Sequence, residues 1–256
     1  MMLALLLFIT AGTATMGIIH YQENRDGGLV LSVVSLLLFF LLLFGKTKID
    51  MKVLELFAGS RSIGKAAEEL GMEVFSSDLT PFEGIHYAVD IREFDINKLP
   101  FAPDVVWASP PCTSFSVASI GRHWNKDGDI ITPKTENAVL GQELVLRTLE
   151  LIRQINPKYW FIENPRGMLR KMPFMESLPI RHTITYCQYG DSRMKPTDIW
   201  TNCEEWTPRP ACKNGMTCHT PAPRGSATGT QGLKGNYERS KIPHDLCIEI
   251  LKSTIN

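Results

Sequence analysis

Residues 52–78, "KVLELFAGSRSIGKAAEELGMEVFSSD", decide the fold that we expect for this chain of 256 residues. An apolar run over 52–57 ends at a turn of small residues, and a helical pattern over 61–71 follows and closes at Gly71. A second strand pattern, 72–78, ends on an acid. Because two parallel strands need a crossover between them, this stretch predicts a β-α-β unit.

The rest of the chain repeats the alternation of strand and helix. Apolar strand patterns cover 103–109 and 158–164, and between them 136–155 reads as a long helix that stops at Asn156-Pro157. Segments 181–189 and 197–202 can complete the sheet. We therefore predict an α/β fold with a mostly parallel, doubly wound sheet, which binds ligands at the carboxyl ends of its strands.

Composition allows this fold and limits the partners. A chain with 44% apolar residues and a formal net charge of zero can bury one large domain with a small appendage. Neutrality argues against a polybasic binder, but a local cluster of positive charge can still hold nucleic acid. The six cysteines are too scattered for a disulfide scaffold, so we expect thiols or metal ligands in a reducing cytosol.

The first fifty residues differ from the rest. Residues 1–19 and 27–45 carry no charge, and each reaches the roughly 18 apolar residues of a membrane helix. A helical hairpin is one interpretation, with both ends and the rest of the chain on the cytoplasmic side because "GKTK" follows the second segment. The other is that Met51 opens a cytoplasmic domain and that 1–50 are an upstream extension or a mis-called start.

The first predicted strand ends in a turn suited to a ligand. Gly59 and Gly64 stand where this strand passes into a helix, and a glycine there lets the backbone approach a ligand closely. Neither GxGxxG nor the Walker pattern is present, which argues against a nucleoside triphosphate. Asp78, at the end of the second strand, could accept hydrogen bonds from ribose hydroxyls. A plain tight turn with a helix-capping acid is the alternative.

A thiol and an acid follow the next two strands. Pro110 and Pro111 stiffen the turn before Cys112, and a stiff turn suits a nucleophile that must be aimed, although a buried structural cysteine is the commoner case. Glu163 leaves an apolar strand, where partial desolvation would raise its pKa and let it act as a proton donor. We expect the two side chains next to each other at neighbouring strand ends.

Six segments together resemble a known family. "LELFAGSRSIG", "SSDL", "VDI", "SPPCTSFS", "ENPRG" and "QYGDSRMKPTDIWTN" are similar, in this order, to the motifs of DNA (cytosine-5) methyltransferases, particularly the short phage-type members. The resemblance covers residues 51–202. It implies the fold of S-adenosylmethionine-dependent methyltransferases and methyl transfer to C5 of cytosine in double-stranded DNA.

The resemblance also implies roles for particular residues. Cys112 would add to C6 of cytosine, Glu163 would contact N3, and Arg193 would join them as a third catalytic group. The cofactor-binding residues would be Phe57, Ala58, Gly59, Ser60, Asp78, Asp90, Ile91 and Pro111. The DNA-binding residues would be Ser116, Lys195, Arg209, Lys213 and Arg224.

Three features depart from the family pattern. Arg61 and Ser62 stand where the family usually has glycines, and Arg193 and Lys195 do not fall on one register with its paired arginines. The large recognition domain and the closing cofactor motif are not evident. In their place we expect a basic segment over 203–241 that recognises DNA, and a final helix within 242–256 that packs on the core.

The basic segment has two candidate functions. It is rich in Pro and Gly with an excess of Lys and Arg, which suits contacts with phosphates, whereas a solvated loop is the alternative. Cys203, Cys212, Cys218 and His219 could supply four ligands to a zinc ion, although their spacing matches no standard finger.

Other functions stay open at this stage. An amino methyltransferase would need an Asp- or Asn-Pro-Pro-aromatic loop, whereas "SPPC" places sulfur at the aromatic position. A non-catalytic DNA-binding protein would not need both the thiol and the acid. RNA as the substrate is harder to exclude. We expect a monomer that acts on double-stranded DNA, with a cognate restriction endonuclease as a candidate partner.

Overall fold

The computed structural model describes residues 5–10, 13–18, 49–117, 120–128, 130–213, 215–221 and 235–255. The chain divides into two compact units, Met1–Thr47 and Lys48–Asn256, which are described separately below.

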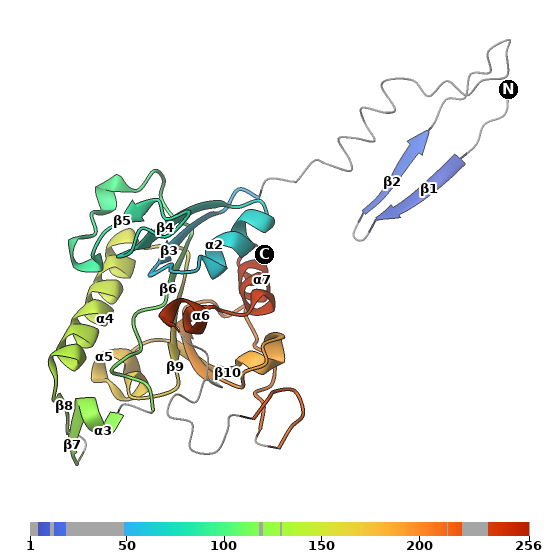
Figure 1. Cartoon of the computed structure of the whole chain (residues 1–256). Helices are drawn as coiled ribbons and strands as arrows, with labels where there is room; N and C mark the ends of the chain where they lie inside the picture. The colour runs from blue at the N-terminus through green and yellow to red at the C-terminus, as the bar shows by residue number, and fades with distance from the viewer. Residues whose placement is uncertain are drawn as a thin grey trace, which may run out of the picture. The chain divides into compact units, whose positions relative to one another are not determined.

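The larger unit contains a seven-stranded sheet in the order β10-β11-β9-β6-β3-β4-β5 (Figure 1). The strands are β3 (Lys52–Leu56), β4 (Glu73–Asp78), β5 (Tyr87–Ala88), β6 (Val105–Ala108), β9 (Tyr159–Pro165), β10 (Ile180–Thr185) and β11 (Pro196–Thr201). The strands from β9 to β5 pair in parallel, whereas β11 is antiparallel to both β9 and β10. The predicted α/β fold with a mostly parallel sheet is confirmed.

Helices cover both faces of this sheet. The three longest in the described chain are α2 (Ser62–Glu69), α4 (Glu136–Ile155) and α7 (His244–Ser253). Helices α2 and α7 pack with the strands in one apolar cluster, and α4 packs in a second cluster on the opposite face (Figure 1). Neighbours along β3 belong to different clusters, Val53 to the first and Leu54 to the second. Burial on both faces explains why the central strands read as continuous apolar runs.

The remaining described elements are short. They comprise β7 (Trp124–Asp127) and β8 (Ile130–Pro133), which form a separate hairpin, with α3 (Ile120–His123), α5 (Pro173–Glu176), α6 (Asn236–Ser240), η1 (Ile91–Glu93), η2 (Ile96–Lys98), η3 (Leu169–Lys171) and η4 (Tyr186–Tyr189).

Helix α4 shows how local sequence sets the boundaries. Thr135 caps its first turn by accepting a hydrogen bond from the backbone N–H of Ala138 at 3.3 Å. Asn156 ends the helix in the left-handed conformation, with φ of 49°, and Pro157 cannot continue it. The predicted boundaries at 136 and 155 are therefore correct.

The smaller unit differs from the helix that the sequence predicted there. Strands β1 (Leu5–Thr10) and β2 (Thr13–Ile18) pair antiparallel, so the apolar helix expected over 1–19 is wrong for these residues. Thr10, Thr13 and Thr15 are β-branched and favour strands, which the count of apolar residues ignored. The second half of the expected membrane hairpin, 27–45, lies outside the described residues. In the described ranges, no helix is long and apolar enough to cross a membrane.

The turn that carries Cys112 is packed against the residues after β9. Ser116 and Gly167 form an isolated bridge, and the backbone N–H of Met168 donates to the carbonyl oxygen of Phe115 at 2.7 Å. A Cβ atom on Gly167 would lie 2.1 Å from that same oxygen. Only glycine therefore allows the two segments to approach this closely.

We expect Gly167→Ala to lower the free energy of unfolding by about 1–3 kcal/mol, the usual cost of forcing atoms into a packed site. Gly121→Ala is the matched control, because a Cβ atom on Gly121 would meet nothing within 4 Å. Urea unfolding of both variants and the wild type provides the measurement. Equal stability of the two variants would contradict the close packing described here.

Candidate active site

Parallel pairing brings the ends of β3, β4, β6 and β9 to one edge of the sheet. Leu56 pairs with both Ser77 and Ala108, and Ala108 pairs with Ile162. The turn that follows β6 therefore begins beside the residue after Ile162, which is Glu163. The expected thiol and acid come from neighbouring strand ends, as the sequence predicted.

Hydrogen bonds fix the turn around Cys112. Asn164 Nδ2 donates to the carbonyl oxygen of Pro110 at 2.9 Å, so β9 holds the first proline in place. The backbone N–H groups of Phe115 and Ser116 donate to the Cys112 carbonyl oxygen, each at 3.0 Å. These bonds and the two prolines leave the thiol little freedom to move relative to the sheet.

Aromatic side chains pack against the same turn. Phe115 is fully buried, and its ring stacks on that of Trp124 with centroids 5.5 Å apart. Trp124 Nε1 also donates to the carbonyl oxygen of Ser114 at 2.7 Å. The β7-β8 hairpin, which begins at Trp124, is therefore tied to the Cys112 turn.

Cys112 lies within reach of groups of both signs. Burial raises the pKa of the Cys112 thiol, the Lys195 ammonium lowers that pKa, and the Glu163 carboxylate raises it. Arg239 also lowers it, to a smaller degree. A thiol in this setting is protonated at rest, and its conversion to the nucleophilic thiolate depends on the neighbouring cations.

Glu163 is 6% exposed and has two partners on one oxygen. The hydroxyl of Tyr186 donates to Glu163 Oε1 at 2.9 Å, and Lys195 Nζ lies 3.8 Å from the same atom. Lys195 Nζ also stands 4.4 Å from the centroid of the Tyr186 ring. Burial and the Glu163 carboxylate raise the pKa of Tyr186, so the phenol stays a hydrogen-bond donor.

Lys195 and Arg193 have different partners. Arg193, expected to be catalytic, is 5% exposed and binds the carboxylate of Asp191, with Nε at 2.9 and 3.0 Å from its two oxygens. Arg193 also donates to the carbonyl oxygens of Arg239 and Lys241 at 3.4 and 3.3 Å. Lys195, expected to contact DNA, is the basic residue beside Glu163.

Two residues of this site were missed. Asp191 has a local signal, because an Asp that bonds the backbone N–H two residues on is a common turn, and its oxygen accepts from the Arg193 N–H at 2.7 Å. Tyr186 has none. It lies in a stretch that reads as an ordinary strand, and only the antiparallel placement of β11 between β9 and β10 brings it to Glu163.

The loop after β3 meets the acid at the end of β4. Gly59 adopts a left-handed conformation with φ of 49°, and its N–H donates to Asp78 Oδ2 at 2.9 Å. The other oxygen of Asp78 accepts from the Thr80 N–H at 2.8 Å. Phe57, Ala58 and Ser60 belong to the same loop, and Ala58 is tied to the Ser77 carbonyl oxygen at 3.0 Å. The two strand ends expected at the cofactor thus lie side by side.

Arg61 explains one departure from the family pattern. It has a positive φ of 55°, a conformation that favours glycine, and the residue is 8% exposed. The guanidinium donates to Ser76 Oγ at 3.1 Å and pairs with Glu68. Arg61 therefore points into the protein rather than across the loop.

Glu55 supports the same loop from inside the sheet. Its carboxylate accepts hydrogen bonds from the N–H groups of Ile63 and Gly64 at 3.0 and 3.1 Å, at the start of α2. Burial raises the pKa of Glu55 to about 7, and these bonds partly oppose that shift. The sequence signal for this residue is a single acid inside an apolar strand.

Other predicted site residues are more dispersed. Asp90 caps η1 and accepts from the Arg92 N–H at 2.9 Å, and Ile91 is buried in the core. Pro111 is exposed beside Cys112, and Lys213 is exposed on the basic segment. Arg209 pairs with Glu249 at 2.8 Å. Arg224 lies outside the described residues.

The predicted set of zinc ligands needs one correction. Cys203 is not with the others, since its sulfur contacts Glu205 at 3.4 Å and Ser253 at 3.6 Å. Cys212, Cys218 and His219 do lie together, and their fourth neighbour is Cys187. Cys187 was missed because it precedes the basic segment by a whole strand, and sequence spacing does not show which turn the segment packs against.

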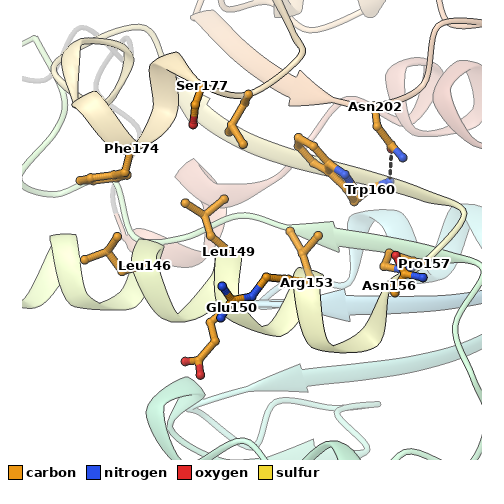
Figure 2. A pocket seen from close by; sticks show the side chains of 12 residues that line it. Leu146, Leu149, Glu150, Arg153, Asn156, Pro157, Trp160, Phe174, Ser177 and Asn202 are labelled. Carbon is orange, nitrogen blue, oxygen red and sulfur yellow. Dashed lines mark hydrogen bonds between the residues drawn. The ribbon is translucent and has the colours of Figure 1, made fainter.

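A concavity lies at the edge of the sheet opposite Cys112 (Figure 2). It has a volume of about 510 Å³ and is lined by α4, α5 and the first residues of β9, where the Trp160 N–H donates to Asn202 Oδ1 at 2.8 Å. None of the predicted catalytic or cofactor residues lines it.

The ends of the neighbouring strands β6 and β9 thus bring a cysteine, Cys112, and an acid, Glu163, to one edge of an α/β sheet. Residues 51–176 match the family model of the C-5 cytosine-specific DNA methylases. A probable DNA (cytosine-5)-methyltransferase of Frog virus 3 (isolate Goorha) is 30% identical over 221 residues, which cover 78% of this chain and 99% of the viral protein. The chain belongs to the C-5 cytosine-specific DNA methylase family.

The solved structures that match this chain are more distant in sequence. The Entamoeba histolytica methyltransferase EhMeth is 13% identical with a TM-score of 0.46, over 64% of this chain and 57% of that one. The S. pombe Dnmt2 methyltransferase is 15% identical with a TM-score of 0.42, over 59% of this chain and 49% of that one. The chain thus spans less than two thirds of either protein.

The charges around Cys112 predict opposite shifts in its reactivity. Lys195→Met removes a cation that lowers the pKa of the thiol, so alkylation of Cys112 should require a higher pH than in the wild type. Glu163→Gln removes an anion that raises this pKa, so alkylation should begin at a lower pH. The measurement is the rate of iodoacetamide labelling of the Cys112 peptide against pH.

Lys158→Met is the matched control for this experiment. Lys158 stands at the other end of β9, with its ammonium 4.8 Å from the centroid of the Tyr159 ring. Its profile should follow the wild type. Shifts of the same sign in Lys195→Met and Glu163→Gln would show that charge does not control the thiol.

Proposed function

We propose that Cys112, Glu163 and Lys195 carry out the transfer of a methyl group from S-adenosylmethionine to C5 of cytosine in double-stranded DNA. The observation that carries the assignment is the contact between Lys195 and Glu163, 3.8 Å apart, next to the thiol of Cys112.

The thiol has the first role. C5 of cytosine is a poor nucleophile, and addition of the Cys112 thiolate to C6 makes C5 electron-rich, like an enamine carbon. Because burial keeps the thiol protonated at rest, the Lys195 cation favours the thiolate when the base is present. After methylation, a solvent base takes the proton from C5, and the electron pair of that C–H bond forms the C5=C6 double bond as the C6–S bond breaks and Cys112 leaves as a thiolate.

Glu163 has the second role. As the thiolate adds to C6, negative charge builds up on the ring, and a carboxyl group that shares or donates a proton at N3 stabilises it. Tyr186 and Lys195 both hold Oε1, so Oε2 lies outside these two contacts. Tyr186 is a positioning residue in this scheme, because it touches Glu163 and not the base.

The cofactor-binding loop fits S-adenosylmethionine. Gly59 and Asp78 would hold the cofactor, which supplies an electrophilic methyl group when bound. A side chain at Gly59 would be strained and would stand 3.6 Å from Ser240 Oγ and 4.0 Å from Asp78 Oδ2. Each Asp78 oxygen accepts one backbone N–H, and a carboxylate has about four acceptor positions, so Asp78 can still accept ribose hydroxyls.

DNA contacts are assigned by exposure and charge. Lys213 is exposed and free to reach phosphates, whereas Arg209 is engaged with Glu249 and with the Tyr189 ring at 4.7 Å. The target base must leave the stack, which costs a few kcal/mol that such contacts offset. A cognate restriction endonuclease is a proposal from the resemblance alone.

Covalent trapping tests the role of Cys112. Duplex DNA with 5-fluorocytosine at the target should form a stable adduct with the wild type, because fluorine at C5 cannot leave as a proton does. Bisulfite sequencing of DNA from expressing cells supplies the target, and RNA carrying the same sequence is assayed beside it. Cys112→Ser should form no adduct and transfer no methyl group.

Cys203→Ser is the control for trapping. Cys203 is buried and distant from Cys112 in the sequence, and a serine hydroxyl can keep the contacts of its sulfur with Glu205 and Ser253. Methyl transfer by Cys112→Ser would remove the thiol from the mechanism. Transfer to RNA but not to DNA would contradict the proposed substrate.

Glu163→Gln should lower the single-turnover rate of methyl transfer by about 10²–10⁴, the usual effect of losing a positioned acid. Glutamine keeps the hydrogen bond from Tyr186, so cofactor affinity should not change. The rate is measured by rapid quench with labelled cofactor. A rate equal to that of the wild type would place Glu163 outside the reaction.

A further inference from the structure

We propose that Cys187, Cys212, Cys218 and His219 form a zinc site, separate from the catalytic residues, that clamps the basic segment onto the catalytic domain. The four ligand atoms lie within 4.8 Å of one another. Cys187 belongs to η4, which follows strand β10, and the other three belong to the segment after β11.

The distances between these atoms suit a tetrahedral ion. With Zn–S bonds of about 2.3 Å and Zn–N bonds of about 2.0 Å, ligand atoms around zinc stand about 3.8 Å apart for two sulfurs and about 3.5 Å for sulfur and nitrogen. The sulfur of Cys218 lies 3.2 Å from that of Cys212 and 3.6 Å from that of Cys187. Nδ1 of His219 lies 3.4 Å from the Cys212 sulfur and 3.8 Å from that of Cys218.

The same distances do not describe a disulfide. All six cysteines are free, and the closest pair of sulfurs in the cluster, at 3.2 Å, is well beyond a bond of about 2.0 Å. Hydrogen bonding between thiols is a weak reason for three sulfurs and an imidazole nitrogen to converge on one point. A thiophilic ion satisfies all four, and three thiolates with one neutral imidazole are a common ligand set for structural zinc.

Adjacent residues can both be ligands here because His219 presents Nδ1. This ring nitrogen is closer to the backbone than Nε2, so it reaches the same point as the neighbouring Cys218 sulfur. Groups around the ligands hold them in place. Gln188 Nε2 donates to the Cys218 sulfur at 3.3 Å, and the backbone N–H of Cys212 donates to Thr185 Oγ1 at 2.8 Å.

The site joins the turn after β10 to the basic segment, which follows β11. Cys187 directly follows Tyr186, which holds Glu163, and the Thr220 N–H, just beyond His219, donates to the Ser192 carbonyl oxygen at 2.9 Å. The loop 191–195, which carries Lys195, therefore follows one zinc ligand, Cys187, in the sequence and is hydrogen-bonded to the residue after another, His219. Bound zinc fixes the position of the basic segment relative to this loop. In a larger recognition domain, a hydrophobic core would have this role.

Metal analysis of the purified full-length chain tests the proposal. Wild-type protein grown with zinc should contain about one zinc ion per chain, and Cys187→Ser and Cys218→Ser should lose it. Cys203→Ser is the matched control and should keep the metal, since its sulfur is outside the cluster. Loading with Co²⁺ should give the visible absorption of a tetrahedral, thiolate-ligated ion in the wild type and in Cys203→Ser only.

A second measurement uses only the wild type, so it does not depend on the folding of a variant. Removal of zinc by a chelator should speed trypsin cleavage after Arg209 or Lys213, and added zinc should restore the original rate. A metal-free wild type, a Cys212–Cys218 disulfide in the untreated protein, or zinc kept by Cys187→Ser and lost by Cys203→Ser would overturn the proposal.

Discussion

The parallel pairing of β6 with β9 is the constraint on which the site depends. The register that sets Ala108 beside Ile162 places the Cys112 turn and Glu163 at one edge of the sheet, and Asn164 then fixes the turn through the Pro110 carbonyl oxygen. Because these strands are buried on both faces, a slip of one residue would move apolar side chains out of both clusters. The hydrophobic core therefore sets the relative position of Cys112 and Glu163.

Charge at this edge is balanced rather than simply positive. A buried carboxylate such as Glu163 is costly unless it is paired and hydrogen-bonded, and Lys195 and Tyr186 supply both. The same ammonium lowers the pKa of Cys112, so one cation pairs with a carboxylate and also favours ionisation of a thiol. Arg193 cannot replace it, because its guanidinium is bound by Asp191.

Much of the fold and part of the site could be predicted from the sequence, because they depend on short-range patterns. Helix α4 follows from its helical pattern and from Asn156-Pro157, and Cys112 and Glu163 follow from the ends of apolar strands. Tyr186 and Cys187 could not be predicted, because their partners are set by the antiparallel insertion of β11. The error over Leu5–Thr10 and Thr13–Ile18 has another cause, since apolar length does not separate a helix from a strand pair.

The cofactor loop shows how this chain accommodates an unusual residue. Arg61 adopts a glycine-like backbone, and its strain is offset by bonds to Ser76 and Glu68 and by contact with Gly84, where any side chain would meet the guanidinium at 2.7 Å. The Arg61 charge also faces the buried Glu55, which anchors the first turn of α2. A glycine in place of Arg61 would remove the guanidinium, so less positive charge would offset the charge of the buried Glu55 carboxylate. The loop therefore keeps the backbone shape that Gly59 needs, while its rigidity comes from an internal ion network instead of from a glycine-rich turn.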